Sequence, residues 1–91
     1  MIVMHPGEYI IEAYLEPLDM SRTELARRLG VSASAVSRIL AGKSDISPEM
    51  AVRFERVLGR SAESWLAMQA DYSLSRAHET VDVSELHALS A

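Results

Sequence analysis

The chain of 91 residues contains no cysteine, which excludes disulfide bonds and thiolate metal sites. It also lacks any apolar run near the roughly 20 residues that a membrane-spanning helix needs. Its first residues show no basic stretch followed by an apolar one, so no secretory signal is predicted and we expect a cytoplasmic protein without a membrane partner. With 48% apolar residues, the composition is that of a folded globular chain.

Signatures of catalysis and of cofactor binding are missing as well. His5, His78 and His87 stand apart from one another and from acidic ligands, so no metal site is predicted. No serine lies in a G-x-S-x-G turn, and there is no glycine-rich phosphate loop. A domain of this length is too short for a deep catalytic cleft. We therefore expect a binding module without enzymatic activity and without a cofactor.

Basic residues are few, and the net charge of −4 is unusual for a nucleic-acid-binding protein, because lysine and arginine supply most of the affinity for phosphates. The charges are, however, unevenly distributed. Residues 1–19 carry four acids and no base, residues 20–60 carry eight bases against four acids, and residues 61–91 carry five acids against one base. A basic centre between acidic ends predicts two surfaces with different partners.

Within the basic centre, residues 21–29 and 32–41 form two short helical patterns that only Gly30 and Val31 separate. Ser21 and Glu24 have the spacing of a capping box at the start of the first helix, and Ser32 is a good N-cap for the second. The predicted buried stripes are Leu25, Ala26 and Leu29, then Val36, Ile39 and Leu40. So tight a connection predicts a helix-turn-helix, which places its second helix in the major groove of DNA.

Three further helices complete the predicted fold. One runs from Pro6 to about Leu15 and is closed by Glu16-Pro17, because the residue before a proline disfavours the helical conformation. Another covers residues 48–58 between Ser47 and Gly59, and the last starts after Ser61. Together these patterns predict an all-α five-helix bundle in residues 1–76. Residues 77–91 have a weak pattern and are predicted to be a flexible C-terminal tail.

Three groups of side chains have two interpretations each. Glu8, Glu12 and Glu16 share one helix face, which is either simply solvated or a docking face for a basic partner. Arg53, Arg56 and Arg60 could extend a phosphate-binding surface, but we expect them mainly to keep the protein solvated. The stripe that contains Trp65, Leu66, Met68 and Tyr72 is predicted to be core, with part of it as an alternative dimer seam.

The candidate DNA-binding residues follow from the geometry of the motif. Base edges would be met by the start and the outer side of the second helix, which carry Ser32, Ala33, Ser34, Ser37 and Arg38. Of these, Arg38 alone can make a bidentate contact to guanine, and Ala33 can touch a thymine methyl group. Phosphates would be held by Ser32, Arg22 and Lys43, with Arg27 as a further candidate. Alternatively, Arg38 is a structural residue that pairs with a nearby acid.

The motifs together resemble a known family. They are His5-Pro-Gly-Glu8, Leu15-Glu-Pro-Leu18, Leu25-Ala26, Gly30-Val-Ser32, Val36-Ser-Arg-Ile-Leu40, Gly42-Lys43, Ile46-Ser-Pro-Glu-Met-Ala51 and Trp65-Leu66 with Gln69 and Tyr72. This pattern is similar to the HigA/VapI-type antitoxins of the Xre helix-turn-helix superfamily, whose fold is lambda-repressor-like. It covers about residues 5–76. Two positions depart from the family pattern, Ser73 where an acid is common and Ala33 where a larger polar base reader is common.

The resemblance implies a transcription repressor that binds, as a homodimer, an inverted-repeat operator in double-stranded DNA of its own promoter. It also implies a cognate toxin, a small mRNA endonuclease of the RelE-like class, which the antitoxin neutralises. Such an RNA-cleaving toxin should be basic, in keeping with the acidic ends of this chain. Two alternatives remain: a free-standing Xre-type repressor without a toxin, which would lack a small basic reading frame beside its gene, and a protein-interaction module that has lost DNA binding.

Overall fold

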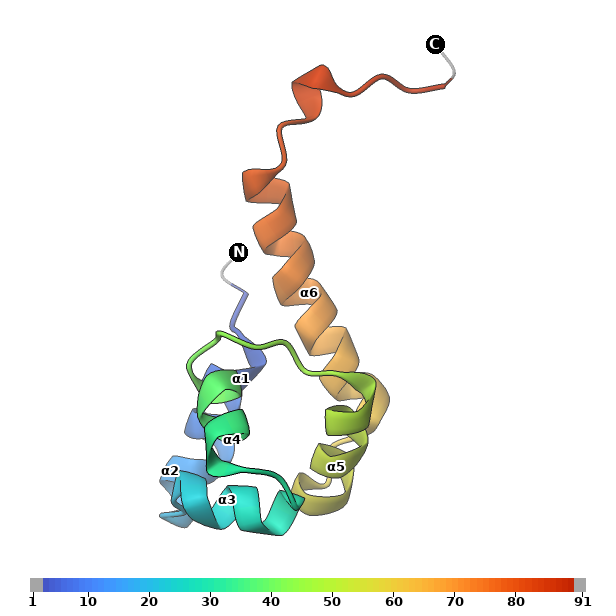
Figure 1. The fold of residues 1–91 in the computed structure, drawn as a ribbon. Coiled ribbons are helices and arrows are strands. Elements are labelled where there is room, and N and C mark those ends of the chain that lie inside the picture. The colour runs from blue at the N-terminus through green and yellow to red at the C-terminus, as the bar shows by residue number, and fades with distance from the viewer. Residues whose placement is uncertain (1–2, 90–91) are drawn as a thin grey trace.

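The computed structural model describes residues 3–89. Helices make up most of residues 6–80, and no strand occurs in this described part of the chain. The all-α class and the five-helix bundle are thereby confirmed, because the first three helical elements form one continuous stretch. Figure 1 shows the helices before residue 60 gathered into a compact body from which the last helix rises.

The sequence predicts that the first helix ends at Glu16-Pro17, but in the structure it continues beyond them. Its consecutive elements are α1 (Pro6–Ile10), the π-helical turn η1 (Ile11–Leu15) and α2 (Glu16–Leu18). In the π-helical turn the Glu16 N–H donates to the Ile11 carbonyl, five residues back. This wider turn accommodates Pro17, which has no N–H to give to an α-helical ladder. The helix ends instead at Asp19, which adopts the left-handed conformation with a φ of 51°.

The three middle helices agree with the predicted bounds to within one residue: α3 (Arg22–Leu29), α4 (Ala33–Leu40) and α5 (Pro48–Leu58). Each is capped by a serine whose Oγ accepts a hydrogen bond from the backbone N–H three residues later, namely Ser21, Ser32 and Ser47. α3 and α5 end at the left-handed residues Gly30 and Gly59. Local capping chemistry therefore accounts for the starts of all three helices and for the ends of α3 and α5.

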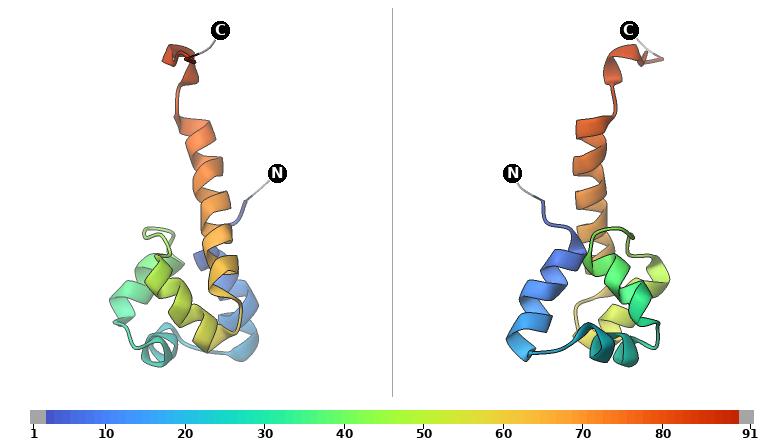
Figure 2. Two further views of the ribbon diagram at one scale, coloured as in Figure 1. Left: turned by 90° about the vertical axis from the view of Figure 1, so that its right-hand side faces the viewer. Right: turned by 60° about the vertical axis from the view of Figure 1, so that its left-hand side comes forward.

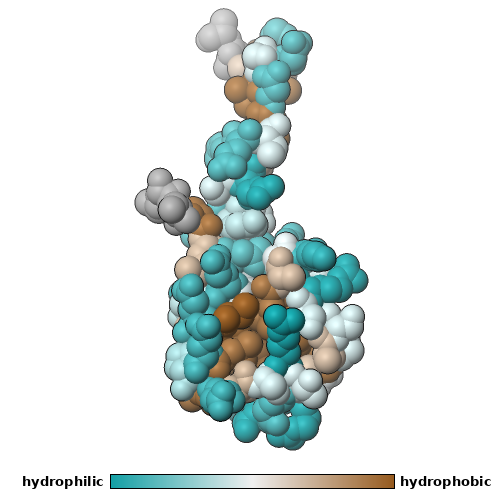
Figure 3. Space-filling view, turned by 90° about the vertical axis from the view of Figure 1, so that its left-hand side faces the viewer, coloured by the Kyte–Doolittle hydropathy of each residue, from teal (hydrophilic) through white to brown (hydrophobic). Residues whose placement is uncertain are grey.

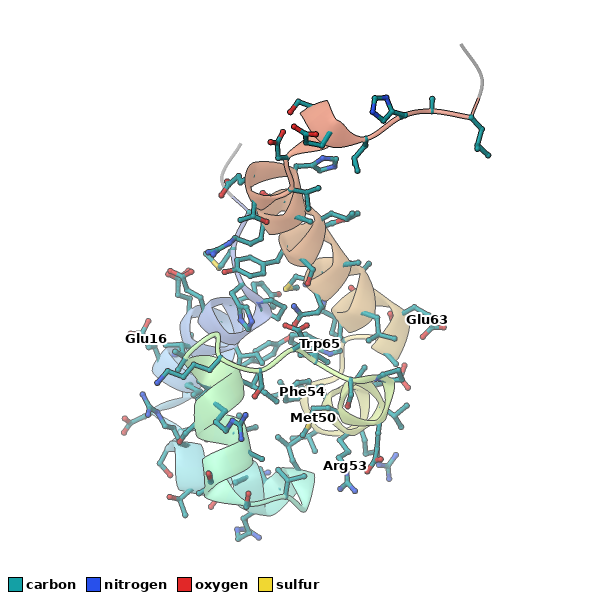
Figure 4. All side chains as sticks on the ribbon, turned by 45° about the horizontal axis from the view of Figure 1, so that its top comes forward. Glu16, Met50, Arg53, Phe54, Glu63 and Trp65 are labelled. Atoms are coloured by element: carbon teal, nitrogen blue, oxygen red, sulfur yellow. The ribbon has the colours of Figure 1, made fainter. Side chains whose placement is uncertain are left out.

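The bundle packs around Trp65 of α6 (Ala62–Thr80), which is completely buried. Its ring centroid lies 5.2 Å from that of Phe54 and 5.9 Å from that of Tyr9. Figure 4 shows Trp65 and Phe54 pointing into the middle of the bundle. The predicted stripes of α3 and α4 are buried throughout. Trp65 is thus a core residue, as expected.

The last helix, α6, is longer than its sequence pattern indicates. Its first half packs against α5 and α1, whereas its last turns stand clear of the bundle (Figures 1 and 2). The molecule is accordingly elongated, with extents of 54 × 22 × 20 Å. Residues 77–80, which were predicted to belong to the tail, are helical, because extending an existing helix needs no new nucleus. Residues 81–89 are exposed and contain the single 3₁₀ turn η2 (Val83–Glu85).

Candidate nucleic-acid interface

Only residues 30–32 connect α3 to α4. Gly30 has a φ of 71°, and the N–H groups of Gly30 and Val31 donate to carbonyls in the last turn of α3. Ser32 then starts α4, and its Oγ accepts from the Ala35 N–H at 3.1 Å. The left-handed residue reverses the chain in so few residues that α4 leaves α3 at a steep angle, as Figure 2 shows. One side of α4 therefore stays outside the bundle.

That outer side carries the predicted base-reading residues. Ser32, Ala33, Ser34 and Arg38 are exposed, and Ser37 is partly buried. The opposite side of α4 is anchored in the core through its buried aliphatic residues, Val36, Ile39 and Leu40. The first N–H groups of any helix have no partner within the helix, and they attract phosphate oxygens. The start of α4 thus combines small side chains that permit close approach with donors suited to an anion.

The predicted phosphate contacts Arg22 and Lys43 are both exposed. Arg22 is the first residue of α3. The Lys43 backbone N–H donates to the Arg38 carbonyl at 2.9 Å, which ties Lys43 to the last turn of α4. None of the ion pairs found in residues 3–89 includes Arg22, Arg38 or Lys43. Within residues 3–89, the three cationic side chains that are predicted to contact DNA therefore form no ion pair.

Glu24 forms only half of the predicted capping box. The Ser21 Oγ accepts from the Glu24 N–H at 3.0 Å, but the Glu24 carboxylate accepts hydrogen bonds from Arg27 and Arg28. The hydrogen bond from Arg27 holds the pKa of Glu24 below its usual value, and the carboxylate is therefore ionised at neutral pH. The charges of Arg27 and Arg28, two bases of residues 20–60, are thus partly compensated by Glu24. This makes Arg27 a weaker candidate for phosphate contact than Arg22.

Arg53 and Arg60 have structural roles in addition to the expected one of keeping the surface solvated, and Arg53 also pairs with Glu49. Arg53 Nη1 donates to the Leu29 carbonyl at 2.7 Å and so satisfies the end of α3 from α5. Arg60 Nη1 donates to the Tyr9 hydroxyl at 2.9 Å, and the guanidinium lies 5.1 Å from the Tyr9 ring centroid. Sequence reasoning missed both because the partners lie 24 and 51 residues away along the chain.

The position of α4 in the bundle is set by its contact with α1. A Cβ atom added at Gly7 would lie 2.1 Å from the Ile39 carbonyl oxygen and 2.8 Å from the Leu40 Cα. Only glycine at position 7 lets the backbones of α1 and α4 approach so closely. Figure 3 shows the face of the molecule that carries these two helices, where apolar side chains gather in a hollow between them.

Gln69, which belongs to the family pattern, holds the loop that follows α4, a role that its place in the predicted helix does not reveal. Its side chain is buried, and its Oε1 accepts from the Ile46 N–H at 2.9 Å. Its Nε2 donates to Asp45 and to the Ser73 hydroxyl, each at 3.2 Å. Ser73, one of the two departures from the family pattern, therefore takes part in the network that fixes the loop carrying Lys43.

The three histidines, which lie apart in the sequence, differ in their burial. His5 is buried at the start of α1, whereas His78 and His87 are exposed. Among residues 3–89 no group of three or more His, Cys, Asp or Glu side chains is arranged to hold a metal ion. None of the helices in this range is long and apolar enough to cross a membrane.

Two capped helices joined by a tight left-handed turn, with one side of the second helix exposed, define a helix-turn-helix. The helix-turn-helix family profile matches residues 11–65, and the chain belongs to that family of DNA-binding regulators. It is 43% identical to the uncharacterized HTH-type transcriptional regulator YddM of Escherichia coli K12, over 92% of this chain and 88% of that one. It is 47% identical to virulence-associated protein A of Dichelobacter nodosus, over 79% and 72% of the two chains.

Among solved structures, the fold is similar to that of the Pseudomonas aeruginosa antitoxin HigA with the higBA promoter. The two chains are 38% identical, the match covers 86% of this chain and 85% of HigA, and the TM-score is 0.82. The protein is thus a DNA-binding helix-turn-helix regulator of the HigA type, in agreement with the resemblance that its sequence carries.

Proposed function

We propose that this protein is a homodimeric antitoxin that represses its own operon and neutralises a basic toxin of the RelE-like mRNA-endonuclease class. The observation that carries the DNA-binding part is the outer side of α4, where Arg38 is exposed and pairs with no acid in residues 3–89. In this proposal Arg38 reads a base, Ala33, Ser34 and Ser37 allow close approach, and Ser32, Arg22 and Lys43 hold phosphates. The solved HigA–promoter structure of a 38% identical chain supports this use of the motif.

Operator binding by the wild-type protein tests this proposal and should weaken steeply with salt. If a dimer contacts about six phosphates, the slope of log K against log salt is about −5. The measurement is fluorescence anisotropy with a duplex from the promoter of its own gene, at several salt concentrations, against a scrambled duplex of equal length. Equal affinity for both duplexes would contradict sequence-specific repression, whereas binding to neither would favour a protein-interaction module that has lost DNA binding.

An exposed apolar groove supports the dimer. It has a volume of about 660 Å³ and is lined by Val3, Met4, Tyr9, Arg60, Met68, Asp71, Leu74, Ser75 and His78. Leu74 is 58% exposed on the projecting half of α6. We assign this groove to a second copy of the chain, because two-fold symmetric operators require two recognition helices held at a fixed separation.

The Leu74→Asp variant should be monomeric at micromolar concentration, because it places a charge in the apolar groove. Its affinity for the full operator should fall at least about tenfold, since each half-site is then bound separately. Sedimentation velocity and the operator titration measure the two effects. The matched control is Val52→Asp on α5, where Val52 is 59% exposed outside the groove and should tolerate the charge. A dimeric Leu74→Asp protein would place the interface elsewhere.

Acidic surface supports a basic toxin as the second partner. Glu8, Glu12, Glu16 and Asp19 are all exposed along the first helical stretch. An RNA-cleaving toxin has to attract phosphates and is therefore expected to be basic. A free-standing repressor, the alternative function, would use the same DNA-binding surface but would need no such acidic face.

A further inference from the structure

His5 occupies an unusual position for a titratable residue. Only 7% of it is exposed, and it precedes α1 as the N-cap. Its Nδ1 accepts a hydrogen bond from the Gly7 N–H at 2.8 Å. An imidazole nitrogen that accepts carries no proton, so the neutral ring carries its proton on Nε2. That Nε2 is buried and has no hydrogen-bond partner within residues 3–89.

The ring of His5 lies beside the residues that end α4 and begin the following loop. A Cβ atom added at Gly42, two residues after α4, would lie 3.7 Å from the His5 ring. On the other side the Tyr72 ring of α6 packs edge-on, with centroids 4.8 Å apart. A hollow of about 330 Å³ is lined by His5 together with Leu40, Ala41 and Gly42 at the end of α4. His5 thus lies where α1, α4 and α6 meet.

We propose that His5 is a positioning residue for DNA recognition. In its neutral form it caps α1 and holds α1 against the end of α4, and its protonation loosens this contact and weakens operator binding. The inference rests on the proposed DNA-binding function, and it makes repression sensitive to mildly acidic pH. Gly7 links the cap of α1 to α4. Its N–H donates the hydrogen bond to His5, and its backbone lies against the Ile39 carbonyl.

Protonation acts directly on the cap. The imidazolium ion is a donor at both nitrogens, so Nδ1 no longer accepts from the Gly7 N–H and two donors face each other. The positive end of the first helix also repels the new charge. Burial keeps the pKa of His5 below its usual 6.5, although the carboxylates of Asp45 and Glu8 partly oppose this shift. Besides these two acids, Tyr72 is the titratable residue whose ring packs against His5.

The direction of the pH effect follows from linkage. Because the pKa of His5 is lower in the folded protein than in the unfolded chain, the unfolded chain binds the proton more readily. The contribution of the neutral cap is therefore fully present above about pH 6.5 and is lost as the pH falls from there toward the folded-state pKa. General electrostatics predicts the opposite trend for DNA affinity, because acidification makes a chain with a net charge of −4 less negative.

The test is a set of operator titrations between about pH 5.5 and 7.5 at constant ionic strength. The wild-type affinity should fall about threefold or more on acidification, against the electrostatic trend. The His5→Asn variant should lose this fall, whatever its affinity at the upper end, because asparagine is a good N-cap that does not titrate. The control variant His87→Gln, at an exposed position in the tail, should keep the wild-type profile.

If the fall in affinity on acidification persists in His5→Asn, the proposal is overturned. If the fall disappears in His78→Gln, the pH effect belongs to the groove of the dimer instead. A second measurement needs no DNA and no variant. In an NMR titration of the free wild-type protein, the His5 imidazole should titrate below 6.5, and the Gly7, Ile39 and Gly42 amides should shift with the same midpoint. Unshifted amides would refute the coupling, whereas coupled amides in a protein that binds no operator would refute only the proposed function.

Discussion

Replacing Gly7 by alanine is expected to destabilise the protein by about 3 kcal/mol, at the upper end of the usual cost of overpacking. The new Cβ would meet the Ile39 carbonyl oxygen and the Leu40 Cα, which are backbone atoms and cannot rotate aside. The first helix therefore has to move away from α4. In an ordinary helix the same change would stabilise by up to about 1 kcal/mol, so the sign of the effect is diagnostic.

Urea unfolding followed by the fluorescence of Trp65, the single tryptophan, measures this loss. Gly59→Ala is the matched control, because nothing lies within 4 Å of its added Cβ and its only cost is a left-handed φ of 91°. That strain amounts to about 1 kcal/mol. If Gly7→Ala proved as stable as Gly59→Ala, the close approach of α1 and α4 would be wrong.

Local patterns were sufficient for the helices that form the motif. Ser21, Ser32 and Ser47 cap their helices as predicted, and Gly30 and Gly59 end theirs, because capping depends on residues within one turn. The buried stripes of α3 and α4 follow from the same helical period. The exposed side of α4 consists of the residues outside its buried stripe. The candidate base-reading residues could therefore be named from the sequence.

Features that depend on distant contacts were not predictable in this way. Arg53 and Arg60 have the composition of a solvated helix face, yet their partners are the Leu29 carbonyl and the Tyr9 hydroxyl. Pro17 is a helix breaker by local rules and is accommodated only because the preceding turn is π-helical. The interactions of the two arginines belong to the packed bundle, whereas Pro17 is accommodated by a local change of helix type, and neither leaves a periodic trace in the sequence.

The role of Gln69 in the site was likewise not predictable from local sequence patterns. Its position in the helix pattern of α6 gives no reason to bury an amide, but the loop after α4 presents the Ile46 N–H and the Asp45 carboxylate to it. A buried amide that satisfies a loop fixes that loop. The geometry of Lys43, and with it the phosphate-binding flank of α4, therefore depends on a residue of another helix.

Arg38→Ala is expected to weaken operator binding about tenfold or more, because a bidentate contact to guanine contributes about 1–3 kcal/mol of discrimination. Arg38 is exposed, and no acid in residues 3–89 forms an ion pair with it, so its removal leaves no unpaired partner in the free protein. The unfolding free energy should stay within about 0.5 kcal/mol of wild type. A loss of affinity at unchanged stability identifies a DNA contact.

The most direct test of the central claim is a competition titration in which wild type, Arg38→Ala and Arg76→Ala bind the operator at equal salt. Arg76 is exposed on the projecting half of α6, and its removal changes the net charge by the same amount. We predict that Arg76→Ala binds within about twofold of wild type, whereas Arg38→Ala loses about tenfold or more and discriminates less against altered operators. Equal binding by Arg38→Ala and wild type would contradict the assignment of α4 as the helix that reads DNA.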